Sequence, residues 1–526
     1  MTKGRWAAII VAANQYRKTG HSRCRVAVWA GKLLPGNMRS YRQACGYGRP
    51  GVFLSNCVRK PRNISDLCIC GTDKFVRKGR KLMSHHQITQ GNIVTTFARY
   101  VSVNILGMIG LSLYVLADTF FVANGVGSTG LVALNIAIPL FSLISGLGML
   151  IGMGGGTLFS IAYGRGDTSS FDRIFTQTLT VTIVIGAVIT LVGLCFTREI
   201  ALLLGATPST LAYVVEYIRV ILTFTVAFML NNVMLYFVRN DFEPGLAMAA
   251  MLAGSLFNIV FDYIFIYPMD MGMFGAALAT GCSPVVGLCI LSFHFWRKKN
   301  HFRLARCSFS GSEILRTLST GLPAFITEFS SGVVIFLFNM VILGISDELS
   351  VAAYGIIANV ALVCVAVFTG IGQGIQPVLS VNFGSGKQDR VRKVLLMGCI
   401  TALVFGSLFL LSGLLFPETI ANIFNGENNP ELTRITVQGI RVYFFAFLLM
   451  GVNIVFSIFF SAVGRPRPSF CIAILRGILA MIPFLVILPP LLGLTGVWLV
   501  IPLAELTTLA VGAVLLLRTL KQMKAD

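Results

Sequence analysis

Long apolar runs separated by short polar breaks recur from about residue 93 to the C-terminus. A helix needs about 20 apolar residues to cross the ~30 Å hydrocarbon core of a bilayer. The runs therefore predict an all-α polytopic membrane protein. We expect twelve transmembrane helices, at 97–122, 131–155, 174–197, 212–238, 246–267, 273–296, 314–343, 351–378, 391–415, 435–462, 470–490 and 494–518.

The second half of the chain repeats a glycine pattern of the first half. Each of four glycines at the end of the second run recurs 220 positions later: Gly152, Gly154, Gly164 and Gly166 match Gly372, Gly374, Gly384 and Gly386. Close helix packing explains single glycines in membrane helices, but it does not explain this shared spacing. Six spans return the chain to its starting side, so the halves are parallel repeats, as in transporters that bind substrate between halves.

This repeat predicts four parts of the chain. We expect a basic, cysteine-containing N-terminal extension at 1–90, an N-lobe of helices 1–6 at 91–300 and a cytoplasmic linker at 301–313. The C-lobe of helices 7–12 follows at 314–526. The strongly basic segment that joins the halves occupies 297–306.

Composition agrees with a membrane protein, since 55% of the 526 residues are hydrophobic and 12% are charged. The net charge of +21 is uneven: residues 1–82 hold 18 Lys and Arg against Asp66 and Asp73, a net of 18 − 2 = +16. The remaining +5 gives no support to a nucleic-acid partner.

The extension contains five cysteines, but Cys68-Ile-Cys70 lacks the spacing of a zinc site. We expect residues 1–82 to lie outside the working protein, with Met83 as the start. A mitochondrial-type presequence is the alternative.

Positive charges mark one end of the predicted bundle. Lys and Arg concentrate in the breaks on the side of the termini, for example at Arg165, Arg239, Lys387 and Arg465, whereas opposite breaks hold little beyond Arg198 and Arg434. The positive-inside rule therefore predicts that both termini are cytoplasmic. The expected location is the cell membrane.

Polar side chains inside the predicted spans are the candidates for function. Asn258 and Asp262 are four residues apart and share one helix face. At ~1.5 Å per residue, Asp118, Asp262 and Thr280 all fall in the outer half of the membrane. A carboxylate in hydrocarbon costs about 3 kcal/mol and commonly marks an ion or proton path.

These four residues could bind a small cation such as Na⁺ or share a proton, because close carboxylates raise one another's pKa. The structural alternative for Asn258 and Asp262 is a polar pair that joins two helices. The alternative for Asp118 is solvation near the outer interface.

The second half holds another acid near mid-membrane, Glu328, which follows Gly321-Leu-Pro323. We expect Glu328, Asn453 and Asn232 to line a substrate cavity, although lone amides in membranes more often join helices. Glu505 is also deep, but the neighbouring Thr507 and Thr508 suggest helix–helix hydrogen bonding equally well.

Several stretches together form a specific family pattern. They are Leu116-Ala-Asp118-Thr-Phe-Phe-Val, Tyr163-Gly-Arg-Gly-Asp167, Val238-Arg-Asn-Asp241, Asn258-Ile-Val-Phe-Asp262, Gly275-Ala-Ala-Leu-Ala-Thr280, Gly321-Leu-Pro323, and Gln376-Pro with Asn382-Phe-Gly-Ser-Gly386. Over about residues 91–520 the chain resembles the multidrug and toxic compound extrusion (MATE) transporters. The resemblance implies a twelve-helix, two-lobe, V-shaped antiporter that expels amphipathic, often cationic, compounds in exchange for protons or sodium ions.

The resemblance also implies roles for single residues. Asp118, Asn258, Asp262 and Thr280 match the N-lobe cation cluster of the bacterial DNA-damage-inducible-type subfamily. Glu328 is about a helical turn from the span-seven acid of the other bacterial subfamily, whose span-ten aspartate is replaced here by Asn453. Ion coupling is therefore predicted in the N-lobe.

Two other functions are alternatives to drug export. A flippase for lipids or lipid-linked precursors is the alternative within transport, and a cavity rich in Arg or Lys would favour it. A membrane-embedded enzyme is disfavoured, because the sequence has no paired-His metal motif, Gly-x-Ser-x-Gly elbow or phosphate loop. We expect a monomer in the lipid bilayer, without a cofactor, that acts on small-molecule drugs or toxins.

Overall fold

The computed structural model describes residues 88–307, 309–425 and 429–525, so the predicted extension at 1–90 lies almost wholly outside the described residues. The described residues form helices and no strands. The N-lobe helices are α5 (Ile93–Gly125), α6 (Ser128–Arg165), α7 (Ser170–Cys195), α8 (Thr197–Leu203), α9 (Leu211–Thr223), α10 (Thr225–Asn240), α11 (Pro244–Ile266) and α12 (Gly272–Trp296). The C-lobe helices are α13 (Gly311–Ile345), α14 (Glu348–Gly384), α15 (Gln388–Leu415), α16 (Pro417–Phe424), α17 (Pro430–Tyr443), α18 (Phe445–Ala462), α19 (Pro466–Ile474), the π-helix η1 (Leu475–Leu479), α20 (Met481–Leu492) and α21 (Leu494–Ala525).

The predicted number of spans is confirmed for the described residues. Eleven helices are long and apolar enough to cross a bilayer, and the pair α9–α10, bent by 50°, provides a twelfth span. The fourth and tenth spans are each two helices, which the hydrophobic pattern does not reveal. Their breaks fall at Phe224 and Phe444, and 444 − 224 = 220, which is the offset of the sequence repeat.

Left-handed glycines end the long helices α6 and α14 at equivalent positions. Gly166 and Gly386 have φ angles of 76° and 72°, which residues other than glycine rarely adopt. At the end of α6, the Gly166 N–H donates to Tyr163 O and the Asp167 N–H donates to Ala162 O, both at 3.0 Å. This pair of the glycine repeat therefore has a direct local cause, since both helices need the same C-terminal turn.

Helices α6 and α14 continue well past the predicted ends of their spans. Helix α6 runs to Arg165 instead of 155, and α14 runs to Gly384 instead of 378. The polar residues of these extra turns have helical partners: Ser160 Oγ donates to Asn240 Oδ1 at 2.6 Å. A prediction from hydropathy ends the span where the apolar residues end. The helix itself continues as long as its polar side chains find hydrogen-bond partners.

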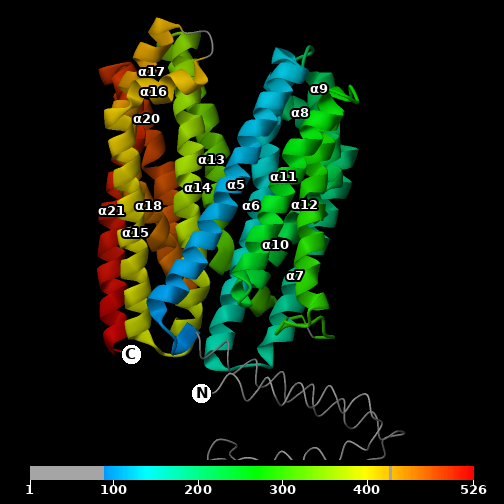
Figure 1. The fold of residues 1–526 in the computed structure, drawn as a ribbon, viewed down its shortest axis with the longest axis vertical. Coiled ribbons are helices and arrows are strands. Elements are labelled where there is room, and N and C mark those ends of the chain that lie inside the picture. The colour runs from blue at the N-terminus through cyan, green and yellow to red at the C-terminus, as the bar shows by residue number, and fades with distance from the viewer. Residues whose placement is uncertain (1–87, 308, 426–428, 526) are drawn as a thin grey trace, which may run out of the picture. The chain divides into compact units, whose positions relative to one another are not determined.

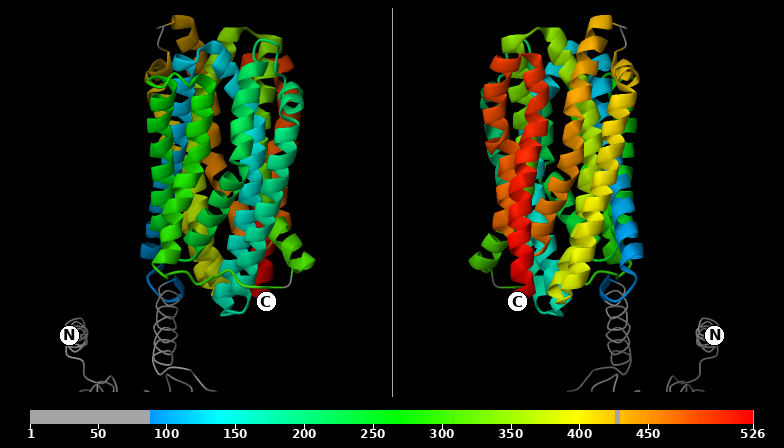
Figure 2. Two further views of the ribbon diagram at one scale, coloured as in Figure 1. Left: turned by 90° about the vertical axis from the view of Figure 1, so that its right-hand side faces the viewer. Right: turned by 90° about the vertical axis from the view of Figure 1, so that its left-hand side faces the viewer.

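Helices α5–α12 lie on one side of the bundle and α13–α21 on the other (Figure 1). In the side views the long helices run roughly parallel to one another (Figure 2). The lobes meet through α5 against α14 and α6 against α13 and α14. These contacts follow the two-fold repeat, because α5 and α6 correspond to α13 and α14.

Small residues bring the two lobes into backbone contact near the basic end. A methyl group at Gly164 would lie 2.3 Å from Val381 O, and one at Gly384 would lie 2.3 Å from Ile161 O. Gln376 adds polar contacts, since its Nε2 donates to Thr157 Oγ1 at 2.8 Å. Asn240 Nδ2 donates to Gln376 Oε1 at 3.3 Å. The basic end is therefore closed by contacts that tolerate no larger side chain.

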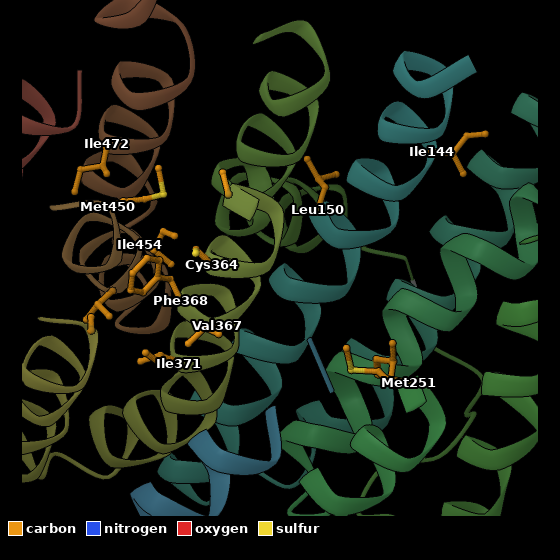
Figure 3. Packing of buried hydrophobic residues seen from close by; sticks show 14 of the residues in the cluster. Ile144, Leu150, Met251, Cys364, Val367, Phe368, Ile371, Met450, Ile454 and Ile472 are labelled. Atoms are coloured by element: carbon orange, nitrogen blue, oxygen red, sulfur yellow. The ribbon is translucent and has the colours of Figure 1, made fainter. Parts of the chain in front are cut away.

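The buried apolar residues of both lobes belong to one continuous cluster. In the C-lobe, Phe368 and Ile371 of α14 lie beside Met450 and Ile454 of α18 (Figure 3). The Phe368 ring sits against Gly451, where a methyl group would come within 2.6 Å of it. This packing holds α18 in place and with it the buried amide of Asn453.

Candidate functional site

The four predicted cation-site residues are buried and come together in the N-lobe. Asn258 and Asp262 lie on α11, Thr280 lies on α12, and Asp118 lies on α5; these three helices pack against one another. Asp118 is 125 − 118 = 7 residues from the end of α5, and Asp262 is 266 − 262 = 4 from the end of α11. Both helix ends are remote from the basic loops.

A chain of hydrogen bonds links these side chains. The Asn258 amide satisfies its neighbours when its nitrogen donates to Asp262 Oδ2 at 3.0 Å and its oxygen accepts from Thr280 Oγ1 at 3.1 Å. The carboxyl groups of Asp118 and Asp262 also lie within hydrogen-bonding reach of each other. Such a bond requires a proton, because two ionised carboxylates are both acceptors.

Part of this cluster has unused bonding capacity. Oδ1 of Asp118 and Oδ1 of Asp262 have no hydrogen-bond partner among the described residues. Buried carboxylate oxygens are normally paired, so unpaired ones are unusual. The cluster can therefore accept a proton or another cation without first breaking an internal bond.

Two tyrosines complete the surroundings of the cluster, and sequence reasoning missed both. Tyr217 of α9 is hydrogen-bonded to Thr280. Tyr114 of α5 interacts electrostatically with Asp118, Asp262 and also Glu328. Its position four residues before Asp118 places both on one helix face, which is the signal that could have found it.

Glu328 lies where the lobes meet. A methyl group at Gly146 of α6 would be 3.6 Å from Glu328 Cβ on α13. The acid also interacts electrostatically with Tyr236 of α10. Glu328 of the C-lobe is thus close enough to Tyr114 and Tyr236 of the N-lobe to interact with them electrostatically.

Asn453 is fully buried within the C-lobe. Its Nδ2 donates to Glu505 Oε2 at 2.7 Å and to Glu505 O at 2.8 Å. Glu505 Oε1 also accepts from Arg476 Nε, on the π-helix η1, at 2.6 Å. Asn453 is thus hydrogen-bonded to one member of a buried ion pair. The charge of Arg476 compensates that of Glu505, which accounts for a carboxylate at this buried position.

Asn232 lies inside the N-lobe. Its Nδ2 would be 3.0 Å from a methyl group at Gly148 of α6, so the glycine makes room for the amide. Asn231, its neighbour on α10, has an Oδ1 without a partner among the described residues. Whether these amides contact substrate stays a prediction.

Two parallel six-span lobes that meet beside buried carboxyl groups define a multi-pass membrane transporter. The MatE family model matches residues 104–264 and 323–487, within both lobes. The chain therefore belongs to the MatE family, whose members are transporters, and the predicted family is confirmed.

Relatives match most of the chain in sequence, and a solved transporter structure shares its fold. The multidrug export protein MepA of Staphylococcus saprophyticus is 26% identical over 411 residues, which cover 78% of this chain and 90% of that protein. MepA of Staphylococcus aureus is 27% identical over 394 residues, covering 73% and 85%. An outward-facing structure of a multidrug resistance MATE family transporter of the MOP superfamily superimposes with a TM-score of 0.78 at 24% identity, covering 83% of this chain and 98% of that one. The subfamily stays a prediction.

Proposed function

We propose that the protein is a secondary antiporter of the cell membrane that exports amphipathic, chiefly cationic, drugs or toxic compounds in exchange for protons or sodium ions. Its helices and family support transport, and the names of the MepA relatives support multidrug export. Basic loops at one end support cytoplasmic termini. The acid at the lobe interface, Glu328, favours cationic compounds over anionic lipids.

The observation that carries the coupling proposal is the direct contact between Asp118 and Asp262, each with an unpaired oxygen. Two carboxyl groups that share one proton can exchange it for Na⁺, because carboxylate, amide and hydroxyl oxygens are ligands of hard cations. The ion drives transport only if it binds the two conformations with different affinities. A cluster built from three helices is suited to that, since movement of α5 against α11 changes its geometry.

Proton- or sodium-driven uptake of a fluorescent cation into inverted vesicles tests this proposal. Asp118→Asn and Asp262→Asn should each remove the gradient dependence and leave the folded fraction unchanged, because Asn keeps the volume and one acceptor. Glu505→Gln is the matched control: it also neutralises a buried carboxylate, but one paired with Arg476. The control should lose stability and keep gradient-driven uptake. Ordinary gradient-driven transport by both aspartate variants would refute the coupling site.

A further inference from the structure

The basic linker (residues 297–306) between the lobes is fixed to the N-lobe. Buried Asp241 at the end of α10 accepts the His301 backbone N–H at 2.8 Å, and its other oxygen contacts His301 Nδ1 at 2.5 Å. His294 Nε2 on α12 contacts the same carboxylate at 2.7 Å. The Arg303 N–H donates to Asp172 Oδ1 on α7 at 2.7 Å.

An aromatic anchor reinforces these polar contacts. Phe302 is fully buried, with its ring 4.4 Å from Phe175, 5.3 Å from Phe237 and 5.4 Å from Phe159, measured between ring centroids. The linker is therefore packed against the N-lobe, and these contacts fix the positions of its anchoring side chains.

Beside the packed linker lies an apolar hollow of about 340 Å³, between α7, α10, α12 and the linker itself. Its volume is within the range of about 300–1,000 Å³ that is common for small-ligand sites. The polar groups on its edge come from the linker. It is lined by Phe175, Leu179, Met234, Phe295, Asn300, Arg303 and Leu304.

The linker that lines one side of the hollow is strongly basic. The linker has five exposed basic residues: Arg297, Lys298, Lys299, Arg303 and Arg306. Lys299 is paired with Glu243. Among the described residues, no ion pair involves the other four.

The hollow also lies at the depth of a membrane surface. Trp296, the last residue of α12, is 83% exposed, and Leu304 is 68% exposed. Exposed tryptophan at the end of a span is typical of the boundary between lipid and water. An apolar hollow at that depth with basic residues on its edge complements a molecule with an apolar chain and an anionic head.

We propose that this hollow binds an anionic phospholipid, with an acyl chain against Leu179, Met234 and Leu304 and the phosphate on Arg303 and Arg306. Basic pockets between membrane helices bind anionic headgroups in this way. The lipid would contact both the linker and α7, so it would strengthen their attachment. This inference concerns a different surface from the transport site and does not depend on the proposed antiport.

Fluorescence of Trp296 provides the test. Purified full-length protein in detergent is titrated with phosphatidylglycerol or phosphatidylcholine carrying brominated chains, which quench nearby tryptophan. Subtracting the Trp296→Phe signal isolates this position. Phosphatidylglycerol should quench at concentrations at least tenfold lower than phosphatidylcholine.

Variants test the headgroup contact and the acyl-chain contact separately. Arg303→Gln with Arg306→Gln should weaken phosphatidylglycerol about tenfold or more, since each basic group contributes to anionic-lipid binding. Arg467→Gln with Arg518→Gln removes the same charge from exposed positions of the C-lobe and should have no effect. Leu304→Asn, a change at an exposed side chain, should weaken the chain contact.

Three results would overturn the proposal. These are equal quenching by both lipids, unchanged phosphatidylglycerol binding in the Arg303/Arg306 variant, and displacement of the lipid by millimolar inorganic phosphate. The last outcome would identify a soluble-anion site. Thermal unfolding of each variant shows that the linker is still folded, so a loss of quenching reports lost binding.

Discussion

Buried carboxyl groups occupy two different environments in this protein. Asp118 and Asp262 contact each other and keep one unpaired oxygen each. Glu505 instead is neutralised by Arg476 and hydrogen-bonded by Asn453. Breaking a buried ion pair costs about 3–5 kcal/mol, because it leaves one charge without a partner. Glu505 is thus suited to holding helices together, and the aspartate pair to changing its charge.

Glu328 should affect substrate choice. Its position at the lobe interface, within electrostatic reach of Tyr114 and Tyr236, suits an acid that attracts cations. Glu328→Gln should reduce the export rate of cationic compounds about tenfold and leave that of a neutral substrate nearly unchanged. Transport of both classes in proteoliposomes measures this. Equal loss for the two would assign Glu328 to ion coupling instead.

Asp241 should stabilise the linker over a wide pH range. Burial alone raises the pKa of Asp241, but the charge of His301 and the hydrogen bonds from His294 and His301 outweigh it, so the net pKa is lowered. A lowered folded-state pKa adds stability that is present above the unfolded value of about 3.9 and is lost as the pH falls through the folded value. Titration of Asp241 should therefore cause no loss of the linker's protection from trypsin between pH 8 and pH 5.

Asp241→Asn removes the charge and should destabilise the docked linker by about 1–3 kcal/mol, because an amide nitrogen replaces one of the two oxygens that bond His294 and His301. Faster trypsin cleavage after the linker arginines reports this. Glu431→Gln, which breaks an exposed pair with Arg434, is the control and should cost less than about 1 kcal/mol. Unchanged linker protection in Asp241→Asn would contradict the docking role.

At the scale of the helix, one glycine decides how closely two elements approach. A methyl group at Gly321 of α13 would lie 1.7 Å from Leu150 O of α6, a backbone atom that cannot move away alone. Gly321→Ala should therefore force α6 and α13 apart, with a cost of about 1–3 kcal/mol. Thermal unfolding in detergent measures it.

Gly245 on α11 is the matched control, since a methyl group there would meet nothing within 4 Å. Gly245→Ala should be neutral or stabilising by up to about 1 kcal/mol, because alanine favours the helix. Similar unfolding temperatures for the two variants would show that contact between α6 and α13 does not depend on Gly321.

At the scale of the whole molecule, Gln376 joins the lobes near the basic end. It bonds Thr157 and Asn240, both in the N-lobe. Removal of these two hydrogen bonds, worth about 0.5–1.5 kcal/mol each, should favour a state in which the basic end is open. Gln376→Ala should therefore increase hydrogen exchange in 152–165 and 370–386, measured by mass spectrometry.

Thr190→Val provides the comparison, because Thr190 Oγ1 donates to Leu222 O within the N-lobe. It should leave exchange at the lobe interface unchanged. If Gln376→Ala behaves like Thr190→Val, the interlobe bonds do not hold the basic end closed.

Much of the architecture could be predicted because hydropathy and repeats are local properties of the chain. The twelve spans, the 220-residue offset and the basic end follow from residue order alone. The shared face of Asn258 and Asp262 also follows, since four residues make about one helical turn. The breaks at Phe224 and Phe444 could not be predicted, because no proline or glycine marks them.

What the sequence by itself determined is which segments span the membrane, how the halves correspond and which polar residues enter the bilayer. Only the tertiary structure decided their partners. Asp118 meets Asp262 across 262 − 118 = 144 residues, Asn453 bonds Glu505, and Asp241 holds the linker through His301. The physical reason is that burial depends on each residue's own apolar surroundings, whereas a hydrogen bond needs two side chains within about 3 Å, which depends on how separate helices pack.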